Sequence, residues 1–218
     1  GEGALRNNTT GTKNTALGVE SLYSNTTANN NSALGYAALY TNTTGAQNTA
    51  IGVNALLANT TASDNTAVGY NALAANTTGA NNVAMGYNSL DANTTGGNNT
   101  GLGFAALGGN TGASNNTAVG YLALNETTTG ANNVSVGSEA LEKNTTGGAN
   151  IAIGAQALEA STTADYNVAI GYQAMHVSTS AYKNVSIGSY SLDAITTGNS
   201  NICIGHDAGT DITTGSNT

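Results

Sequence analysis

The sequence predicts an all-β fold, a parallel β-solenoid (β-roll) whose coils are 17 residues long. Glycines recur every 17 residues from Gly1 to Gly205 without a slip. Twelve copies of this unit account for 204 of the 218 residues, with 14 left over. A short fixed period is typical of stacked coils in which each repeat contacts its neighbours. We therefore expect a single repeat domain over residues 1–218, with twelve full repeats, a partial one and no capping repeats.

The repeats align in 17 columns when each unit is numbered from its asparagine, which places the periodic glycine in column 5. Column 1 is Asn and column 13 is Thr in every repeat, and column 15 is only Gly or Ala. Such columns indicate side chains that stack and hydrogen-bond at turns, and glycine in column 5 indicates a positive φ. The predicted structural ladders, in alternate repeats, are Asn14, Asn48, Asn82, Asn116, Asn150, Asn184, Thr26, Thr60, Thr94, Thr128, Thr162, Thr196, Gly18, Gly52, Gly86, Gly120, Gly154 and Gly188.

Columns 2 to 4 predict a strand, because small and large residues alternate there as Thr-Ala-Val or Val-Ala-Ile. Column 4 is always large and apolar, and column 9 is Leu except at Met175 and Gly209. We expect both columns to face the core as two apolar stripes. Columns 12 to 14 form a candidate second strand, and columns 6 to 10 fit either a short helical turn or a bent strand.

The composition excludes several classes of function. Charged residues make up only 7% of the chain and the formal net charge is −8, which argues against nucleic acid, since phosphate binding needs clustered Lys and Arg. No run approaches the roughly 18 apolar residues of a membrane span. We therefore expect neither nucleic acid nor a membrane span among the partners of this chain.

Side chains that carry chemistry are few and scattered. His176 and His206 fall in different columns two coils apart, and Glu142 and Glu159 are neighbours in column 10. Cys203 replaces a small residue in column 3 and has no second cysteine to pair with. The calcium-binding repeats of other β-rolls and the glycine-rich phosphate loops are absent. The sequence predicts a protein that is not an enzyme, with no catalytic residues, cofactor or metal.

The tripeptide Asn-Thr-Thr recurs from column 12. Formally these are acceptor sites for N-glycosylation, although a chain rich in Asn and Thr produces the pattern readily. Real glycosylation is the lesser of the two interpretations, and it would coat one edge of the solenoid. The asparagines are Asn8, Asn25, Asn42, Asn59, Asn76, Asn93 and Asn144.

The repeat Asn-Thr-Ala-[Leu/Ile/Val]-Gly-Tyr-x-Ala-Leu-x-x-Asn-Thr-Thr-Gly resembles arrays in phage tail-fibre-like and bacterial surface proteins. Its Ala-[Ile/Val]-Gly centre, as at residues 50–52, 152–154 and 169–171, is also similar to the head repeats of YadA-like trimeric autotransporter adhesins. The resemblance covers the whole chain and implies three chains assembled as β-rolls. The adhesin repeat is shorter, and its second half differs from the Leu and Asn-Thr-Thr columns found here.

Column 2 changes along the chain, from mostly Thr or Ser to Val or Ile. A continuous apolar face needs a partner, so we expect the later residues to form a self-association face: Val134, Ile151, Val168, Val185 and Ile202.

These observations predict an extracellular structural or adhesive fibre segment at a cell or virion surface. It would self-associate into a homotrimer or a head-to-tail filament, and it would attach to a host surface, a receptor or a glycan. The alternative is an ice-binding solenoid that uses the Thr ladder, although adjacent threonines in a strand offer only one outward rank. A carbohydrate depolymerase would need a carboxylate pair in a groove, which the sequence does not show.

Overall fold

A computed structural model describes residues 1–216 of this chain as an all-β parallel β-solenoid with 17-residue coils. Each coil contributes one three-residue strand from columns 2 to 4 and returns through turns and irregular chain. The chain divides into two compact units, residues 1–112 and residues 113–218.

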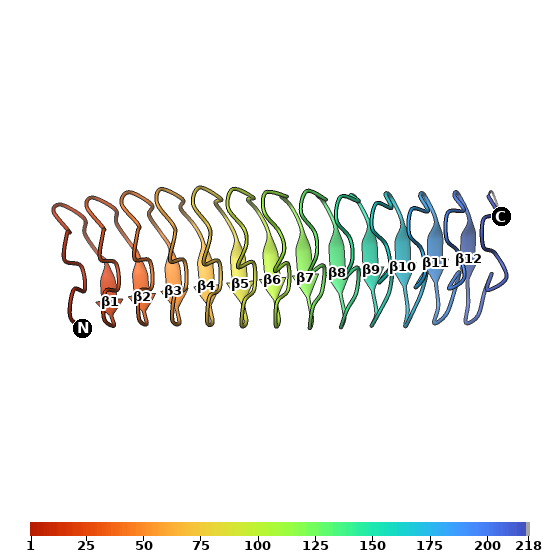
Figure 1. The fold of residues 1–218 in the computed structure, drawn as a ribbon, viewed down its shortest axis with the longest axis horizontal. Coiled ribbons are helices and arrows are strands. Elements are labelled where there is room, and N and C mark those ends of the chain that lie inside the picture. Colours follow the sequence, from red (N-terminus) through yellow and green to blue (C-terminus); the bar gives the residue numbers. More distant parts are fainter. Residues whose placement is uncertain (217–218) are drawn as a thin grey trace. The chain divides into compact units, whose positions relative to one another are not determined.

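The first unit is a ladder of parallel strands in which each strand pairs with the next coil (Figure 1). The register is one full repeat throughout, so that Ala33 lies opposite Ala50 and like columns stack on like. This register follows from the sequence period, because a slip of one residue would turn the outward columns inward. The strands are β1 (Thr15–Leu17), β2 (Ser32–Leu34), β3 (Thr49–Ile51), β4 (Thr66–Val68), β5 (Val83–Met85) and β6 (Thr100–Leu102).

The second unit repeats the arrangement with the same register, as in the pairing of Ala152 with Ala169. Neighbouring strands again come from successive coils. The strands are β7 (Thr117–Val119), β8 (Val134–Val136), β9 (Ile151–Ile153), β10 (Val168–Ile170), β11 (Val185–Ile187) and β12 (Ile202–Ile204).

The core of each coil is narrow and partly polar. Column 9 supplies its large apolar side chain in nearly every coil, as at Leu56 and Leu158, which are fully buried, and Ile195 of column 12 adds a second one near the C-terminal end. Around it lie the small residues of columns 3 and 8 and the buried asparagines of column 1. The expectation that column 9 faces the core is therefore correct.

The expectation that column 4 faces the core is wrong. The middle residue of each strand from β2 to β12 points inward, and its two neighbours point outward. Leu17 is 62% exposed and Ile153 is 37% exposed, whereas Ala152 between two outward residues is fully buried. Space on the inner side is limited: column 3 holds nothing larger than Cys203, and at Gly101 even an added Cβ would lie 2.7 Å from Ser89 Oγ. The large residues must then face outward, because successive strand residues point to opposite faces.

The segment from column 6 to column 11 is neither a helical turn nor a bent strand. Columns 7 and 9 have positive φ, 58° at Asn54 and 53° at Leu56, while Ala55 between them does not. Hydrogen bonds that close tight turns within the coil, such as Leu57 N–H to Asn54 O (3.2 Å), alternate with hydrogen bonds to the next coil, such as Leu56 N–H to Ala72 O (3.0 Å). Left-handed leucine costs about 1–2 kcal/mol, and burial of its side chain contributes about 1.5–3 kcal/mol in return.

Columns 12 to 14 do not form the second strand that the sequence suggests. In residues 1–216 each coil has a bend there. The backbone contact between coils converges on one carbonyl, as where Thr43 N–H and Thr44 N–H both donate to Thr60 O (2.9 and 3.3 Å). The same described residues contain no helix long and apolar enough to cross a membrane.

Candidate functional surface

Two buried asparagine ladders connect the coils of each unit. In column 1, Asn65 accepts the backbone N–H of Asn82 (2.9 Å) with its side-chain oxygen and donates to the carbonyl of Gly79 (3.0 Å). In column 12, Asn76 donates to the same Gly79 carbonyl (2.9 Å) and to the side-chain oxygen of Asn59 (2.9 Å). The carbonyl of column 15 thus accepts hydrogen bonds from two asparagine side chains. These bonds give partners to the buried carbonyl and to both amide groups, which burial would otherwise leave unsatisfied.

The column 1 ladder continues through Asn48, Asn82, Asn116, Asn150 and Asn184, each of which is buried, while Asn14 is only half-buried. The sequence alone does not predict the column 12 ladder, because its asparagines also fit candidate glycosylation sites. Asn25, Asn42 and Asn59 are fully buried and hydrogen-bonded. A glycan cannot be attached to such a side chain in the folded coil, so the structure disfavours glycosylation there.

The threonine ladder of column 13 is hydrogen-bonded to backbone. Thr60 Oγ1 donates to the carbonyl of Thr77 (3.2 Å), and Thr94 Oγ1 donates to Thr111 (2.8 Å). The same contact recurs at Thr26, Thr128, Thr162 and Thr196. These hydroxyl protons serve coil stacking, which leaves the neighbouring column 14 as the exposed threonine rank.

The column 5 glycines have the positive φ that the sequence indicates, 135° at Gly52 and 141° at Gly86. A Cβ at Gly52 would overlap the carbonyl oxygen of Gly69, and one at Gly86 would overlap that of Gly103. Two independent constraints therefore select glycine in this column. The same φ region holds at Gly18, Gly120, Gly154 and Gly188.

The predicted self-association face lies on the outward side of the strands. Ile151 and Ile202 are 36% and 64% exposed, and Val134, Val168 and Val185 are half-buried. Column 4 shares this outward side, a feature that sequence reasoning missed because it assigned large aliphatic residues to the core. The signal available in the sequence was the small column 3, since a three-residue strand cannot bury both its middle residue and its flanks on one side.

An aromatic ridge runs beside the strands in column 6. The rings of Tyr70 and Tyr87 stack with centroids 5.1 Å apart, and Tyr87 stacks on Phe104 at 5.3 Å. These three side chains are exposed. Near the start of the same unit, Tyr36 and Tyr40 line a shallow pocket of about 250 Å³ together with Glu20, Ala37, Asn54 and Leu57.

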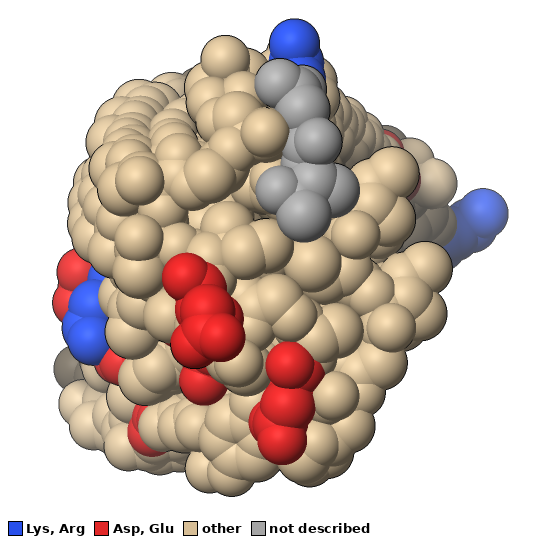
Figure 2. All heavy atoms as spheres, turned by 90° about the vertical axis from the view of Figure 1, so that its right-hand side faces the viewer, with Lys and Arg blue, Asp and Glu red and all other residues tan. Residues whose placement is uncertain are grey.

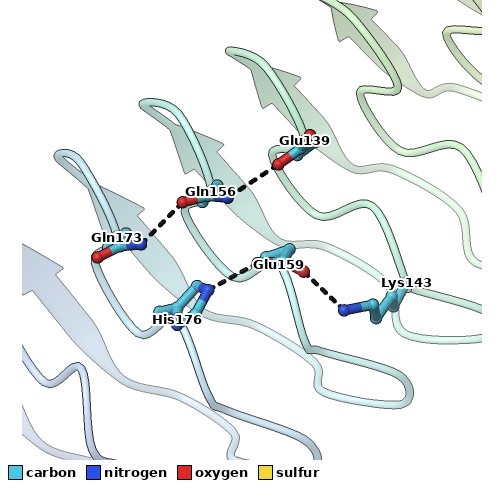
Figure 3. Close-up of polar contacts among 6 residues, drawn as sticks. All are labelled: Glu139, Lys143, Gln156, Glu159, Gln173 and His176. Carbon is cyan, nitrogen blue, oxygen red and sulfur yellow. Dashed lines mark hydrogen bonds and ion pairs between the residues drawn. The ribbon is translucent and has the colours of Figure 1, made fainter.

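Charged side chains are sparse on the surface, and the face shown in Figure 2 consists mostly of uncharged residues. Their main cluster lies in the second unit, where Glu159 accepts hydrogen bonds from Lys143 Nζ and His176 Nε2, both at 2.6 Å (Figure 3). A parallel row connects Gln173, Gln156 and Glu139 at 2.8 Å per step.

The Glu159 cluster shifts the pKa of its members. Burial acts to raise the pKa of Glu159, but the hydrogen bonds from Lys143 and His176 outweigh it and the pKa is lowered. The bond to Glu159 raises the pKa of Lys143. Partial burial, together with the charges of Glu139 and Glu159, raises the pKa of Glu142. The arrangement is an ion-paired surface network.

The described residues hold no group of three or more His, Cys, Asp and Glu side chains placed to bind a metal ion. His206 Nδ1 contacts the carboxylate of its neighbour Asp207 (2.8 Å) on an exposed turn. Cys203 is a buried free thiol in column 3, and burial raises its pKa.

Comparisons with protein families, curated proteins and solved structures find no match to this chain.

Proposed function

We propose that this chain is a structural segment of an extracellular fibre, at a cell or virion surface, that self-associates as a trimer or filament and presents its sides to a host surface, receptor or glycan. One observation carries the proposal: the invariant columns of the repeat join one coil to the next. Asn, Thr and Gly columns bond or pack to the same column of the neighbouring coil. The resemblance of the repeat to fibre arrays supports the same function.

In a fibre segment, the useful property of the repeat is that coils can be added one after another to set the length. In a solenoid each coil contacts only its neighbours, so length is set by the number of repeats, and stability sums over coils and their interfaces. Catalysis has no place in this proposal, and neither does nucleic acid, because the chain has only four Lys and Arg residues to offer phosphates.

Repeat-number variants test the proposal. Duplication of residues 48–64, one whole coil, should give a folded protein whose melting temperature is retained or raised and whose length grows by about 4.8 Å. Small-angle scattering and circular dichroism measure both. The matched control duplicates only residues 48–56, which adds an incomplete coil that cannot stack column on column and should lower the melting temperature. A whole-coil duplication as damaging as the control would contradict the proposal.

The second candidate is ice binding, favoured by a different column from the one predicted. Thr49, Thr66 and Thr100 place their side chains on the outward side of the strands beside large aliphatic residues of column 4. The column 13 threonines weaken this candidate, because their hydroxyls already donate to backbone. Thermal hysteresis and ice-crystal shape distinguish the two functions, since a fibre segment should change neither.

A further inference from the structure

Columns 2 and 4 of strands β1–β12 face outward and form what we call the outer strip of each unit. The composition of column 4 does not fit a surface exposed to water. Column 4 faces outward, yet all twelve of its residues are Leu, Ile, Val or Met. The twelve coils act as an internal comparison, because an outward position in contact with water tolerates polar substitution. Column 10 illustrates this freedom, with residues as different as Tyr23, Asp91, Glu142 and His176. Column 4 has no polar or charged residue in any of the twelve coils.

We infer that the outer strip is the surface on which a second copy of this chain packs. The inference rests on the proposed function and specifies its self-association surface. Apolar residues retained without exception at an exposed position need a partner that keeps water from them. Because the side chains of the outer strip recur once per coil in each unit, the partner must present complementary side chains at the same spacing.

The chemistry of the outer strip favours a second copy over an unrelated protein. None of its column 2 or column 4 residues is charged, so like strips meet without repulsion. A second copy also presents aliphatic ridges at the same one-coil spacing, which allows side chains to interdigitate along the whole of a unit. The stacked rings of Tyr70, Tyr87 and Phe104 lie beside the strip, and aromatic residues are enriched at protein interfaces.

The area is sufficient for a stable pair. The outer strip and the aromatic column beside it span columns 2 to 6, and six strands at about 4.8 Å spacing with five residues at about 3.3 Å each give about 475 Å² per unit. If each unit pairs with its counterpart, the two units together offer about 950 Å², which exceeds the roughly 800 Å² per partner of a standard interface. One unit alone falls short, so we expect both units to engage.

The second unit should contribute more than the first. Its column 2 residues from β8 onward are Val or Ile, whereas β1–β4 and β6 have Thr or Ser there. The outer strip of β8–β12 is therefore apolar in both columns. The change from Thr to Val or Ile removes hydroxyls that would lose water on association without gaining a partner.

The test measures the mass of the full chain in solution by size-exclusion chromatography with light scattering. The wild type should give at least twice the chain mass of 21.5 kDa. The double variant Ile153→Lys/Ile170→Lys should give a single-chain mass, because it places paired charges in the strip. The matched control, Thr163→Lys, adds a charge at an exposed position of column 14 and should keep the wild-type mass.

A second pair of variants guards against a folding defect. Ile153→Thr/Ile170→Thr keeps the β-branched shape that suits a strand, and it should fold by circular dichroism while weakening association at least tenfold in sedimentation. A monomeric wild type, or a strip variant that folds and keeps the wild-type mass, would overturn the inference. The repeat-duplication experiment measures length and melting temperature, not mass. A negative result for the outer strip would therefore overturn this inference and leave the fibre proposal to be decided by the repeat variants.

Discussion

The shared carbonyl of Gly79 allows a sharp test of how the buried asparagines stabilise the fold. Asn65 in column 1 and Asn76 in column 12 both donate to it, at 3.0 and 2.9 Å. Replacing either with alanine removes one donor and leaves the other in place. Replacing both leaves a buried carbonyl without a side-chain donor.

The structure sets the size of each effect. Asn65→Ala also removes the acceptor of the Asn82 backbone N–H, which is bonded at 2.9 Å. A buried donor without a partner costs about 1–3 kcal/mol, and a lost hydrogen bond about 1 kcal/mol. We therefore expect Asn65→Ala to lower the free energy of unfolding by about 2–3 kcal/mol. Asn76→Ala should cost a similar amount, because it breaks the bonds to Asn59 and Gly79 and removes the side-chain oxygen that accepts from Asn93 Nδ2, which keeps only its bond to Gly96.

The double variant should cost more than the sum of the two single variants, by about 1–2 kcal/mol, because only it removes both donors of Gly79 O. Urea unfolding followed by far-ultraviolet circular dichroism measures all four corners of the cycle. Thr78→Ala, at an exposed position of the same coil, is the control and should change stability by less than about 0.5 kcal/mol. Strictly additive single effects, or an Asn65→Ala cost no larger than that of the control, would refute the reasoning.

Three further changes probe other parts of the fold. Gly86→Val should lower the melting temperature by several degrees, since its Cβ would overlap the Gly103 carbonyl at a φ of 141°; an unchanged melting curve would remove the need for glycine in column 5. Leu73→Asp should prevent folding of the first unit and Leu73→Ala should cost about 2–5 kcal/mol in urea unfolding, because this side chain is fully buried; tolerance of Asp would place column 9 outside the core. Glu159 has a lowered pKa in the folded state, so its contribution is present above about pH 4.5 and lost as the pH falls through the lowered value. Glu159→Gln should therefore flatten the dependence of melting temperature on pH below 4.5, and an identical profile would show that the ion pair with Lys143 does not stabilise the fold.

Much of the coil was predictable because it depends on one residue at a time. The 17-residue period predicts the solenoid, the column 5 glycines predict a positive φ, and the leucines of column 9 predict the core. Each of these follows from the chemistry of a single column repeated in every coil, so the repeats reinforce the signal. The candidate surface was predictable only in part: Ile151 and Ile202 were expected at an association face, and column 4 beside them was not.

The remaining features depend on how columns meet. Hydrophobicity predicts that Ile153 is buried, but only packing decides whether the coil or another molecule buries it. In each coil columns 8 and 9 leave room inward only for a small residue such as Ala152. Asn76 reads as a surface sequon until the fold places it beside a buried carbonyl. The left-handed conformation of Leu56 has no signal in its own residue type, because it results from the turn and from the space the core offers its side chain. Residue chemistry and spacing therefore specify the repeat, while the contacts between columns specify which side of it faces water.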